Sequence, residues 1–277
     1  EGNPRNSQNS GTGVYRSIDG GHSWTCMGLE DSRNIHRLVI DPTDPNTVYA
    51  GVQGSAWGDS ETRGVFKTTD GGQTWQKMLY VNPSTGIADL VMDPDNPNKL
   101  IAAMWEFRRT PWFFTSGGAG SGIYITWDGG EHWKKLTAAD GLPGTPLGRI
   151  GLAIAPSDPD IVYALIESEK NALYGSRDGG LAWHKINDQN VGNRPFYYAD
   201  IRVHPEDPMR IYNLHTFVTK SEDGGRHFTD FAVWENKPTD LHPDHHAWWI
   251  DPDNPDRMLD GNDGGLNVTY DGGKTWR

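Results

Sequence analysis

The sequence predicts an all-β protein built from repeated four-stranded antiparallel sheets. Only 35% of the 277 residues are hydrophobic, yet the chain contains 12 Trp and 34 Gly, as expected for a core of large side chains held between many tight turns. An eight-residue motif recurs along the whole chain, and strand-like runs joined by proline-rich turns lie between its copies. The length is sufficient for one large domain or two small ones.

The recurring motif has the pattern Ser/Thr-x-Asp-Gly-Gly-x-x-Trp/Phe. Its copies are SIDGGHSW (17–24), TTDGGQTW (68–75), TWDGGEHW (126–133), SRDGGLAW (176–183), SEDGGRHF (221–228) and TYDGGKTW (269–276). We expect the Asp carboxylate to accept hydrogen bonds from nearby backbone N–H groups while the glycines take positive φ, which makes a tight hairpin turn. The aromatic residue then anchors the next strand. We therefore interpret these Asp residues as structural, rather than as calcium ligands or catalytic groups.

The segments between the motifs complete a four-strand unit. RLVIDPTDPNTVYAG and its four counterparts each read as a strand (A), a Pro-bounded turn and a second strand (B), and runs such as GVFKT supply strand C before the Asp turn and strand D. The Asp residues recur every 45 to 58 residues, the spacing of β-propeller blades. We predict a single β-propeller domain or propeller segment over residues 1–277, with about five to six blades, incomplete or part of a larger protein. The predicted blades are a partial one at 13–28, full ones at about 35–80, 88–136, 149–186 and 199–233, and a last one at 246–277.

These turns resemble the Asp-box (BNR) repeats of β-propellers such as sialidases, xyloglucan-hydrolysing glycosidases, sortilin-type receptors and a photosystem II assembly factor. Longer stretches, among them RGVFKTTDGGQTW and HHAWWIDPDNPDRMLDGNDGG, are similar to large secreted bacterial proteins described as sortilin-like or glycosyl-hydrolase-like. The resemblance covers nearly the whole chain and implies the fold, but its members share the turn and not the chemistry. It also implies a secreted, extracellular or periplasmic location.

The charge and the hydropathy exclude some classes of partner. A net charge of −12 without a basic stripe does not favour nucleic acid. No apolar run approaches 18 residues, so we expect no membrane span. The lone cysteine, Cys26, cannot form an internal disulfide and reads as a small core residue.

Antiparallel order sorts the loops into two groups. The A–B turns and the Asp turns must lie at one end of each sheet, called here the Asp-box end, and the B–C and D–A connections at the other, the loop end. The loop end receives long, irregular segments rich in Arg, aromatic residues and His, so we predict the binding site there. The predicted substrate-binding residues are His36, Trp57, Arg63, Trp105, Arg108, Arg109, Trp112, Arg149, Arg194, Tyr197, Tyr198 and His245.

A glycosidase needs two carboxylates about 5 to 10 Å apart on either side of the scissile bond. Asp89 and Asp200 occupy the same position near the start of strand A in non-adjacent predicted blades, and they are the predicted catalytic pair, with His246 as a further catalytic residue. Each carboxylate could equally bind a backbone amide or an arginine.

The stretch LHPDHHAWW contains a histidine cluster. His245 and His246 point to opposite sides of a strand, so a metal is more easily shared by Asp244, His246 and Asp263 of the following GND loop. The alternatives are a ligand-binding histidine and histidines that only form hydrogen bonds between blades. No cofactor is required, and a divalent metal is the one alternative.

The arginines at positions 108, 109, 149 and 194 could converge on an anionic group, as the arginine triad of sialidases does. No F/Y-R-I-P motif precedes the first Asp turn, which weakens the sialidase comparison, and arginines paired with nearby carboxylates are the alternative.

The functional hypothesis is an extracellular Asp-box propeller that binds a polysaccharide or glycan at its loop end and, if it is an enzyme, acts as a glycoside hydrolase. One alternative is a sortilin-like propeller that binds a peptide or protein without catalysis. The other is an architectural module beside other domains of a longer secreted chain.

Overall fold

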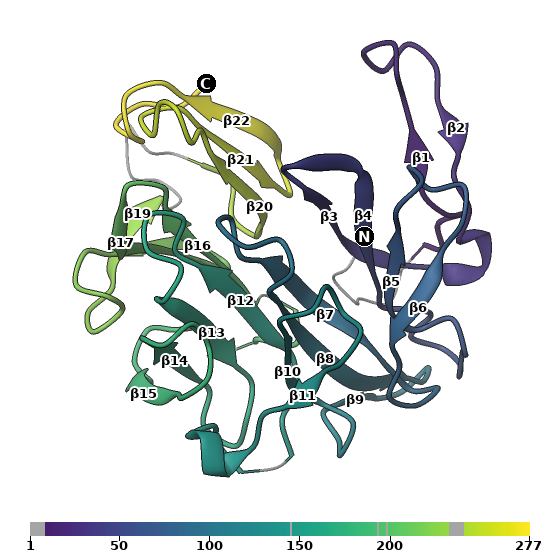
Figure 1. Cartoon of the computed structure of the whole chain (residues 1–277). Coiled ribbons are helices and arrows are strands. Elements are labelled where there is room, and N and C mark those ends of the chain that lie inside the picture. Colours follow the sequence, from purple (N-terminus) through teal and green to yellow (C-terminus); the bar gives the residue numbers. More distant parts are fainter. Residues whose placement is uncertain (1–8, 145, 193, 198, 233–240) are drawn as a thin grey trace. The chain divides into compact units, whose positions relative to one another are not determined.

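The computed structural model describes residues 9–144, 146–192, 194–197, 199–232 and 241–277. The fold is all-β, as predicted, with antiparallel sheets throughout the described chain and two short 3₁₀ turns at Glu30–Ser32 and Ala138–Asp140 (Figure 1). The chain divides into two compact units. The first comprises Glu1–Thr137 and Gly144–Ile150, and the second Ala138–Pro143 and Gly151–Arg277.

The first unit contains a two-stranded hairpin and two larger sheets. The hairpin pairs β1 (Tyr15–Arg16) with β2 (Thr25–Cys26), and Cys26 is exposed there, so the expectation of a core cysteine is wrong. The next sheet has the order β3 (Ile35–Asp41), β4 (Asp44–Val52), β5 (Gly64–Thr68), β6 (Gln76–Leu79). The third sheet has the order β7 (Thr85–Met92), β8 (Leu100–Arg109), β10 (Gly122–Thr126), β11 (Lys134–Lys135), and the short strand β9 (Phe114–Ser116) pairs with the extended end of β8.

The second unit contains two sheets of four strands and one of three. They are β12 (Ile150–Ile154), β13 (Val162–Ile166), β14 (Ala172–Ser176), β15 (His184–Asn187); then β16 (Asp200–His204), β17 (Asp207–Leu214), β18 (Val218–Ser221), β19 (Thr229–Ala232); then β20 (His245–Ile250), β21 (Met258–Asn262), β22 (Gly265–Thr269). Each strand pairs with the next along the chain, which is the predicted A-B-C-D order of a propeller blade.

The Asp turns have the predicted hydrogen bonds. In the second copy, the Asp70 carboxylate accepts hydrogen bonds from the Thr68 hydroxyl at 2.7 Å and the Thr74 N–H at 2.9 Å. Gly72 N–H donates back to the Thr68 hydroxyl at 2.9 Å. The two glycines have φ of 72° and 97°, a region that a side chain rarely tolerates, which explains the Gly-Gly pair.

The Asp turn lies beside the A–B turn of its own sheet, as antiparallel order requires. Gly71 N–H donates to the Asn46 carbonyl at 3.0 Å, and the first glycine of four other copies makes the same bond to its own A–B turn. The connections that run from B to C and from D to the next A therefore lie at the opposite end of each sheet. The distinction between the Asp-box end and the loop end is thus confirmed sheet by sheet.

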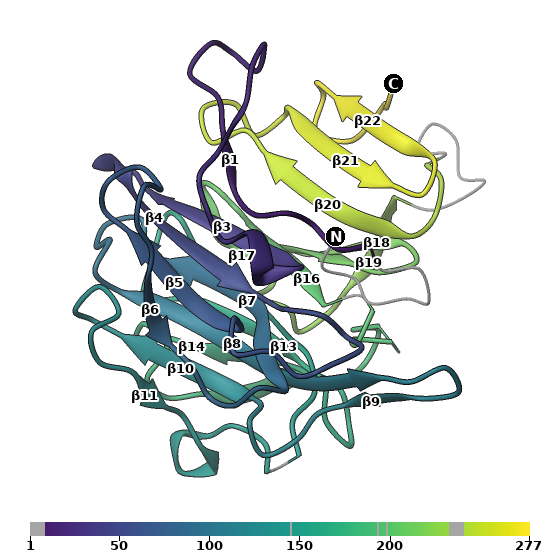
Figure 2. The ribbon, with the colours of Figure 1, turned by 90° about the vertical axis from the view of Figure 1, so that its right-hand side faces the viewer.

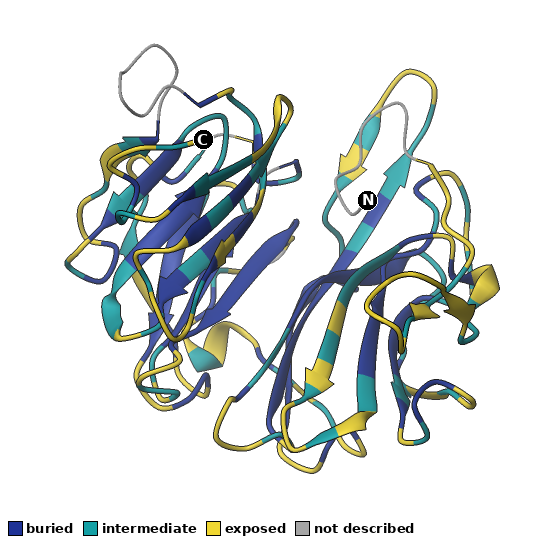
Figure 3. Cartoon of the chain, turned by 90° about the horizontal axis from the view of Figure 1, so that it is seen from above, coloured by how far each residue is buried: buried dark blue, intermediate teal, exposed yellow. Residues whose placement is uncertain are grey.

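The core of each unit lies between neighbouring sheets, where the strands are buried and the turns are exposed (Figure 3). In the first unit Tyr49 and Val65 of one sheet pack with Ile87 and Met104 of the next. Each such side chain stabilises the fold by roughly 1.5–3 kcal/mol through burial. In the second unit a Cβ at Gly151 would lie 1.7 Å from the Ala199 carbonyl, so the innermost strands approach too closely for any side chain at that position. No helix in the described part of the chain is long and apolar enough to cross a membrane.

Candidate functional site

The loop end of the first unit presents exposed aromatic side chains. Strands β8 and β9 form a hairpin that extends beyond its sheet (Figure 2), and at its tip Trp112 and Phe113 are 81% and 55% exposed. Trp57, 47% exposed, lies on the neighbouring loop 53–63. Arg109 N–H donates to the Ala56 carbonyl at 2.8 Å, which joins the loop to the hairpin. We call loop 53–63 and hairpin 107–116 together the aromatic platform.

Arg108 and Arg109 fasten the aromatic platform from within. The Arg108 guanidinium forms an ion pair with Asp59, which makes a second link between hairpin and loop. The guanidinium carbon of Arg109 lies 5.2 Å from the centre of the Phe114 ring. Both were predicted to bind substrate, and the structure places both in contacts within the platform.

A buried column of two stacked rings with a guanidinium group at each end supports the platform. Trp105 is fully buried and stacks on Phe107 with ring centres 4.3 Å apart. The guanidinium of Arg149 lies 5.6 Å from the Trp105 ring and that of Arg63 lies 4.8 Å from the Phe107 ring. Trp105 Nε1 also donates to the Ser116 hydroxyl at 2.9 Å. Trp105 was predicted to bind substrate, and the structure buries its ring beneath the β8–β9 hairpin.

Arg63 holds the loop of the platform in place. It is fully buried, and its guanidinium donates to the carbonyls of Gln53, Ser55 and Gly58 at 2.9, 2.5 and 3.1 Å. Burial, and then the nearby charge of Arg108, lower the pKa of Arg63 to about 10. Burying these carbonyls without hydrogen bonds would cost free energy, and the planar guanidinium, with its five donors, supplies those bonds. The structure thus places Arg63, which was predicted to bind substrate, in hydrogen bonds to carbonyls of the chain itself.

The predicted residues His36, Asp89 and Arg149 lie near the inner strands of the first unit. Arg149 is 1% exposed and its Nη2 is 3.4 Å from His36 Nε2. Asp89 is 2% exposed, and its carboxylate binds Arg37 Nε at 2.7 Å and Leu90 N–H at 2.9 Å. Asp89 is thus anchored in an ion pair with the neighbouring innermost strand.

Asp200 has a similar environment in the second unit. It is 4% exposed, and its carboxylate lies 3.2 Å from Arg202 Nη1. The two predicted catalytic carboxylates therefore belong to different units, and each has an arginine partner of its own.

His245 begins β20 and turns into the core of the second unit. Its Nδ1 is 2.8 Å from the Asp260 carboxylate, and both side chains are completely buried. The other Asp260 oxygen accepts a hydrogen bond from the Asn262 amide at 2.8 Å. His215 lies alongside, since its carbonyl accepts from His245 N–H at 3.1 Å. Burial, and then the His245 charge, lower the pKa of His215 to about 4.

His246 lies at a register shift of β20, contacts a different carboxylate from His245, and belongs to a second small cluster. Its Nε2 is 2.9 Å from the Asp263 carboxylate, and its ring meets the edge of Tyr197 at 5.4 Å between centres. Arg194 lies 5.8 Å from the Tyr197 ring. Asp244, with φ of 67°, accepts a hydrogen bond from Asp263 N–H at its carbonyl. Tyr197 is buried rather than at the surface.

The structure thus brings His246 and Asp263 into contact, and it places Asp244 beside them through the backbone. Among the described residues, no group of three His, Cys, Asp or Glu side chains is arranged to hold a metal ion. Tyr198, predicted to bind substrate, lies outside the described residues.

Comparison with known proteins gives the same fold. A family model described as sortilin, neurotensin receptor 3 (Sortilin-Vps10) matches residues 12–141. The structure of an ancestral GH74 enzyme superposes with a TM-score of 0.69 at 20% identity, over 98% of this chain and 36% of that one. A GH74 enzyme from Niastella koreensis superposes with a TM-score of 0.58 at 18% identity, over 96% of this chain and 47% of that one. This chain is an Asp-box β-propeller.

The curated relatives of this Asp-box propeller are described as xyloglucanases. One from Paenibacillus sp is 26% identical over 67% of this chain and 20% of its own length. Another, described as a probable oligoxyloglucan-reducing end-specific xyloglucanase of Neosartorya fischeri, is 23% identical over 90% of this chain and 33% of its own length. The chain thus spans about a fifth to a third of these relatives.

Sequence reasoning missed two members of the buried histidine cluster of the propeller, His215 and Asp260. The sequences of the B strands did contain a signal for Asp260. The position occupied by Ala in three of the repeats, as in Ala50, is occupied by Asn213 and Asp260 in the last two. Because that position is buried in every sheet, a carboxylate there requires a buried partner, and His245 supplies it.

Proposed function

We propose that this propeller binds a polysaccharide of the xyloglucan type at the loop end of its sheets, as part of a longer extracellular protein. The observation that carries the proposal is the aromatic platform of the first unit, where Trp57, Trp112 and Phe113 remain exposed on segments fastened to each other. The faces of sugar rings are apolar enough to stack on such rings. The descriptions of the curated relatives support this class of ligand.

The buried column suits the platform to binding. Exposed Trp and Phe side chains on a mobile loop would lose conformational entropy when a ligand ordered them, whereas segments fixed in advance lose less. Here the Arg63 hydrogen bonds fix the loop, and the Trp105–Phe107 stack fixes the base of the hairpin. The protein has therefore already met part of the cost of ordering these rings when it folds.

Hydrolysis is the finer part of the proposal. Asp89 and Asp200 are the candidates for the carboxylate pair, with His246 as a third polar group, and the arginine partner of each carboxylate holds it in a fixed orientation. If the chain contributes catalytic groups, Asp89→Asn or Asp200→Asn in the full-length protein lowers xyloglucan hydrolysis by two orders of magnitude or more. Full activity after both substitutions would remove these residues from the mechanism.

A sortilin-like module that binds a peptide is the second candidate, and the match of the sortilin model to residues 12–141 favours it. The same exposed rings fit the apolar side chains of a peptide. The two candidates differ in the ligand that binds. Under the first proposal a xyloglucan oligosaccharide binds the platform directly, whereas under the second only a peptide with apolar side chains binds and the oligosaccharide does not.

A place in a longer protein is supported by an apolar groove beside the β1–β2 hairpin. The groove measures about 340 Å³ and is lined by Trp24, Leu38 and Ile40, which are 61%, 49% and 59% exposed. In the following sheet the equivalent strand β7 is almost fully buried by its neighbour. Packing by a further segment would cover the groove in the same way.

Calorimetric titration with a xyloglucan oligosaccharide tests the platform. We expect Trp57→Ala and Trp112→Ala each to weaken binding about tenfold or more, because aromatic residues that a ligand covers often supply much of the binding free energy. Trp127→Ala is the matched control, since Trp127 is 44% exposed but lies at the Asp-box end of the same unit. Unchanged affinity in both platform variants, or an equal loss in the control, would contradict the proposal.

A further inference from the structure

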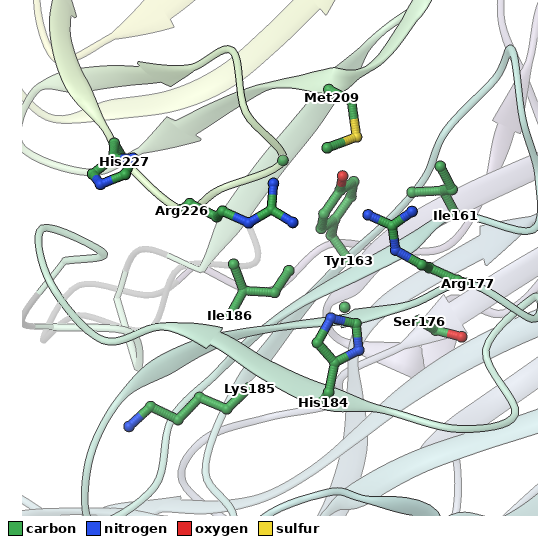
Figure 4. A pocket seen from close by; sticks show the side chains of 12 residues that line it. Ile161, Tyr163, Ser176, Arg177, His184, Lys185, Ile186, Met209, Arg226 and His227 are labelled. Carbon is green, nitrogen blue, oxygen red and sulfur yellow. The ribbon is translucent and has the colours of Figure 1, made fainter.

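A cavity of about 350 Å³ lies at the Asp-box end of the second unit, between the sheet β12–β15 and the sheet β16–β19 (Figure 4). Its floor includes Ile161, Tyr163, Ile186 and Met209, and its polar lining is mainly cationic. None of the described residues that line it is acidic. This composition stands out in a chain with a net charge of −12.

One strand that lines the cavity has a glycine where its counterparts carry a side chain. The residue before the Ser/Thr of the Asp turn is Lys67 in the first full sheet, where its ammonium lies 5.3 Å from the Tyr49 ring and donates to the Gly129 carbonyl at 3.1 Å. The same position is Gly175 above Tyr163, the counterpart of Tyr49. The ammonium that lies over the tyrosine ring in one sheet therefore has no counterpart in the other, where Ile186 and His184 lie nearest to Gly175.

The walls of the cavity come from two positions of the Asp-box motif that vary freely. Arg177 is the second residue of one copy, and Arg226 is the residue after Gly-Gly in the next copy. Three other pairs of consecutive copies lie within one unit. Their residues at these two positions are Ile18 and Gln73, Thr69 and Glu131, and Glu222 and Lys274. Of these four pairs, only Arg177 and Arg226 are both cationic.

The two arginines converge on the cavity. Figure 4 shows their guanidinium groups on either side of Tyr163, whose hydroxyl is already used, because it donates to the Pro208 carbonyl at 2.9 Å. Both arginine charges act on that hydroxyl, although burial, the larger effect, raises the pKa of Tyr163 to about 12. Arg226 donates through Nη1 to the Asp223 carbonyl at 3.1 Å, which orients its guanidinium.

The other basic groups of the lining are already neutralised or lie further out. His227 pairs with Asp223 at 2.6 Å and Lys185 pairs with Asp188 at 2.6 Å. In Figure 4 both of these side chains point away from the middle of the cavity, whereas His184 lies beneath it. The positive charge that faces the cavity is therefore mainly that of the two arginines. Two like charges on one cavity repel each other, and a bound anion between them relieves the repulsion.

We propose that this cavity binds a small organic anion, with its carboxylate or phosphate between Arg177 and Arg226 and its less polar part on Ile161, Ile186 and Met209. Guanidinium forks bind both kinds of oxyanion, and the volume suits a ligand of about one sugar ring. The cavity is formed by the second unit and the aromatic platform by the first, so the inference does not depend on the proposed polysaccharide binding.

Titration at low ionic strength with glucuronate, glucose 6-phosphate and glucose tests the site. We expect both anions to bind, glucose not to bind, and each of Arg177→Gln and Arg226→Gln to weaken binding about 10- to 100-fold. Lys274→Gln is the matched control, since Lys274 occupies the motif position of Arg226 in the next copy, and it should leave the affinity unchanged. The relative affinities of the two anions show whether the site prefers a carboxylate or a phosphate.

A second variant fills the cavity without changing its charge. In Gly175→Gln the new side chain enters the space over Tyr163, where a Cβ would already lie 2.6 Å from the flexible end of Ile186, and we expect loss of anion binding with both arginines present. The proposal is overturned if neither anion binds the folded wild type, if binding survives in the Arg177→Gln/Arg226→Gln double variant, or if Lys274→Gln weakens it equally.

Discussion

Two pairs of arginines occupy opposite ends of the sheets and differ in what they contact. Arg63 and Arg149, at the loop end of the first unit, are at most 1% exposed, and their guanidinium groups lie against rings and carbonyls of the chain itself. Arg177 and Arg226, at the Asp-box end of the second unit, are exposed and line a cavity. Arginines on a long, irregular loop can thus be structural. An arginine at a repeat position where the other copies carry other residues is the better sign of ligand binding.

The largest effect expected from this comparison is the loss of Arg63. Arg63→Met leaves the carbonyls of Gln53, Ser55 and Gly58 without these donors, and each buried unsatisfied group costs about 1–3 kcal/mol. We expect the free energy of unfolding in urea to fall by at least about 3 kcal/mol. Arg63→Lys, which keeps the charge but not the planar fork, should recover only part of this loss. A loss below about 1 kcal/mol in the Met variant would show that Arg63 is not structural.

A smaller effect is the pH dependence of stability, which we expect to differ between His215 at the loop end and the Asp turns at the Asp-box end. The pKa of His215 at the loop end is lowered to about 4 by burial and then by the His245 charge, so the unfolded chain binds more protons than the folded one between pH 6.5 and 4. Stability must therefore fall as the pH falls through that window, by about 1 kcal/mol between pH 6.5 and 5.5. His215→Asn should remove this slope from urea unfolding measured at each pH, whereas His22→Gln, at an exposed position, should keep it.

The Asp turns respond at lower pH. In Asp271 the bonds from the Thr275 side chain and N–H lower the pKa to about 2, so this carboxylate stabilises the fold above its unfolded value near 3.8. That stabilisation is lost as the pH falls from about 4 to 2. If the losses of stability assigned to His215 and to Asp271 occurred in the same pH window of an acid titration, these two residues would not be their separate causes.

The smallest effect concerns the arginines of the cavity. Because Arg177 and Arg226 are exposed, Arg177→Gln and Arg226→Gln should each change the free energy of unfolding by less than about 0.5 kcal/mol. The same urea titrations used for Arg63 measure this. A loss of 2 kcal/mol or more would make these arginines structural and remove the contrast between the two ends.

The sequence was sufficient for the fold because its repeats carry local information. The Asp turn needs only Ser/Thr, Asp and two glycines within a few residues, so Thr68 to Thr74 specify their own geometry. The assignment of each loop to one end of its sheet then followed from antiparallel order alone. Neither step requires knowledge of distant contacts.

The environment of the site residues could not be obtained in the same way. Trp105 and Arg63 are buried because a hairpin formed by later residues packs over them, and Asp260 is buried against a histidine from another strand. Such contacts depend on packing between segments that no local pattern encodes. The cavity lined by Gly175 left one trace in the sequence, which is a glycine where the other C strands have Arg16, Lys67, Ile125, Lys220 and Val268.

The most direct test of the separation between the two ends is one calorimetric experiment on the Arg177→Gln/Arg226→Gln protein. Glucuronate and a xyloglucan oligosaccharide are titrated in turn into this variant and into the wild type at low ionic strength. We expect the variant to bind the oligosaccharide with unchanged affinity and to show no glucuronate binding. Retained glucuronate binding, or loss of both ligands together, would contradict the assignment of separate sites to the two ends.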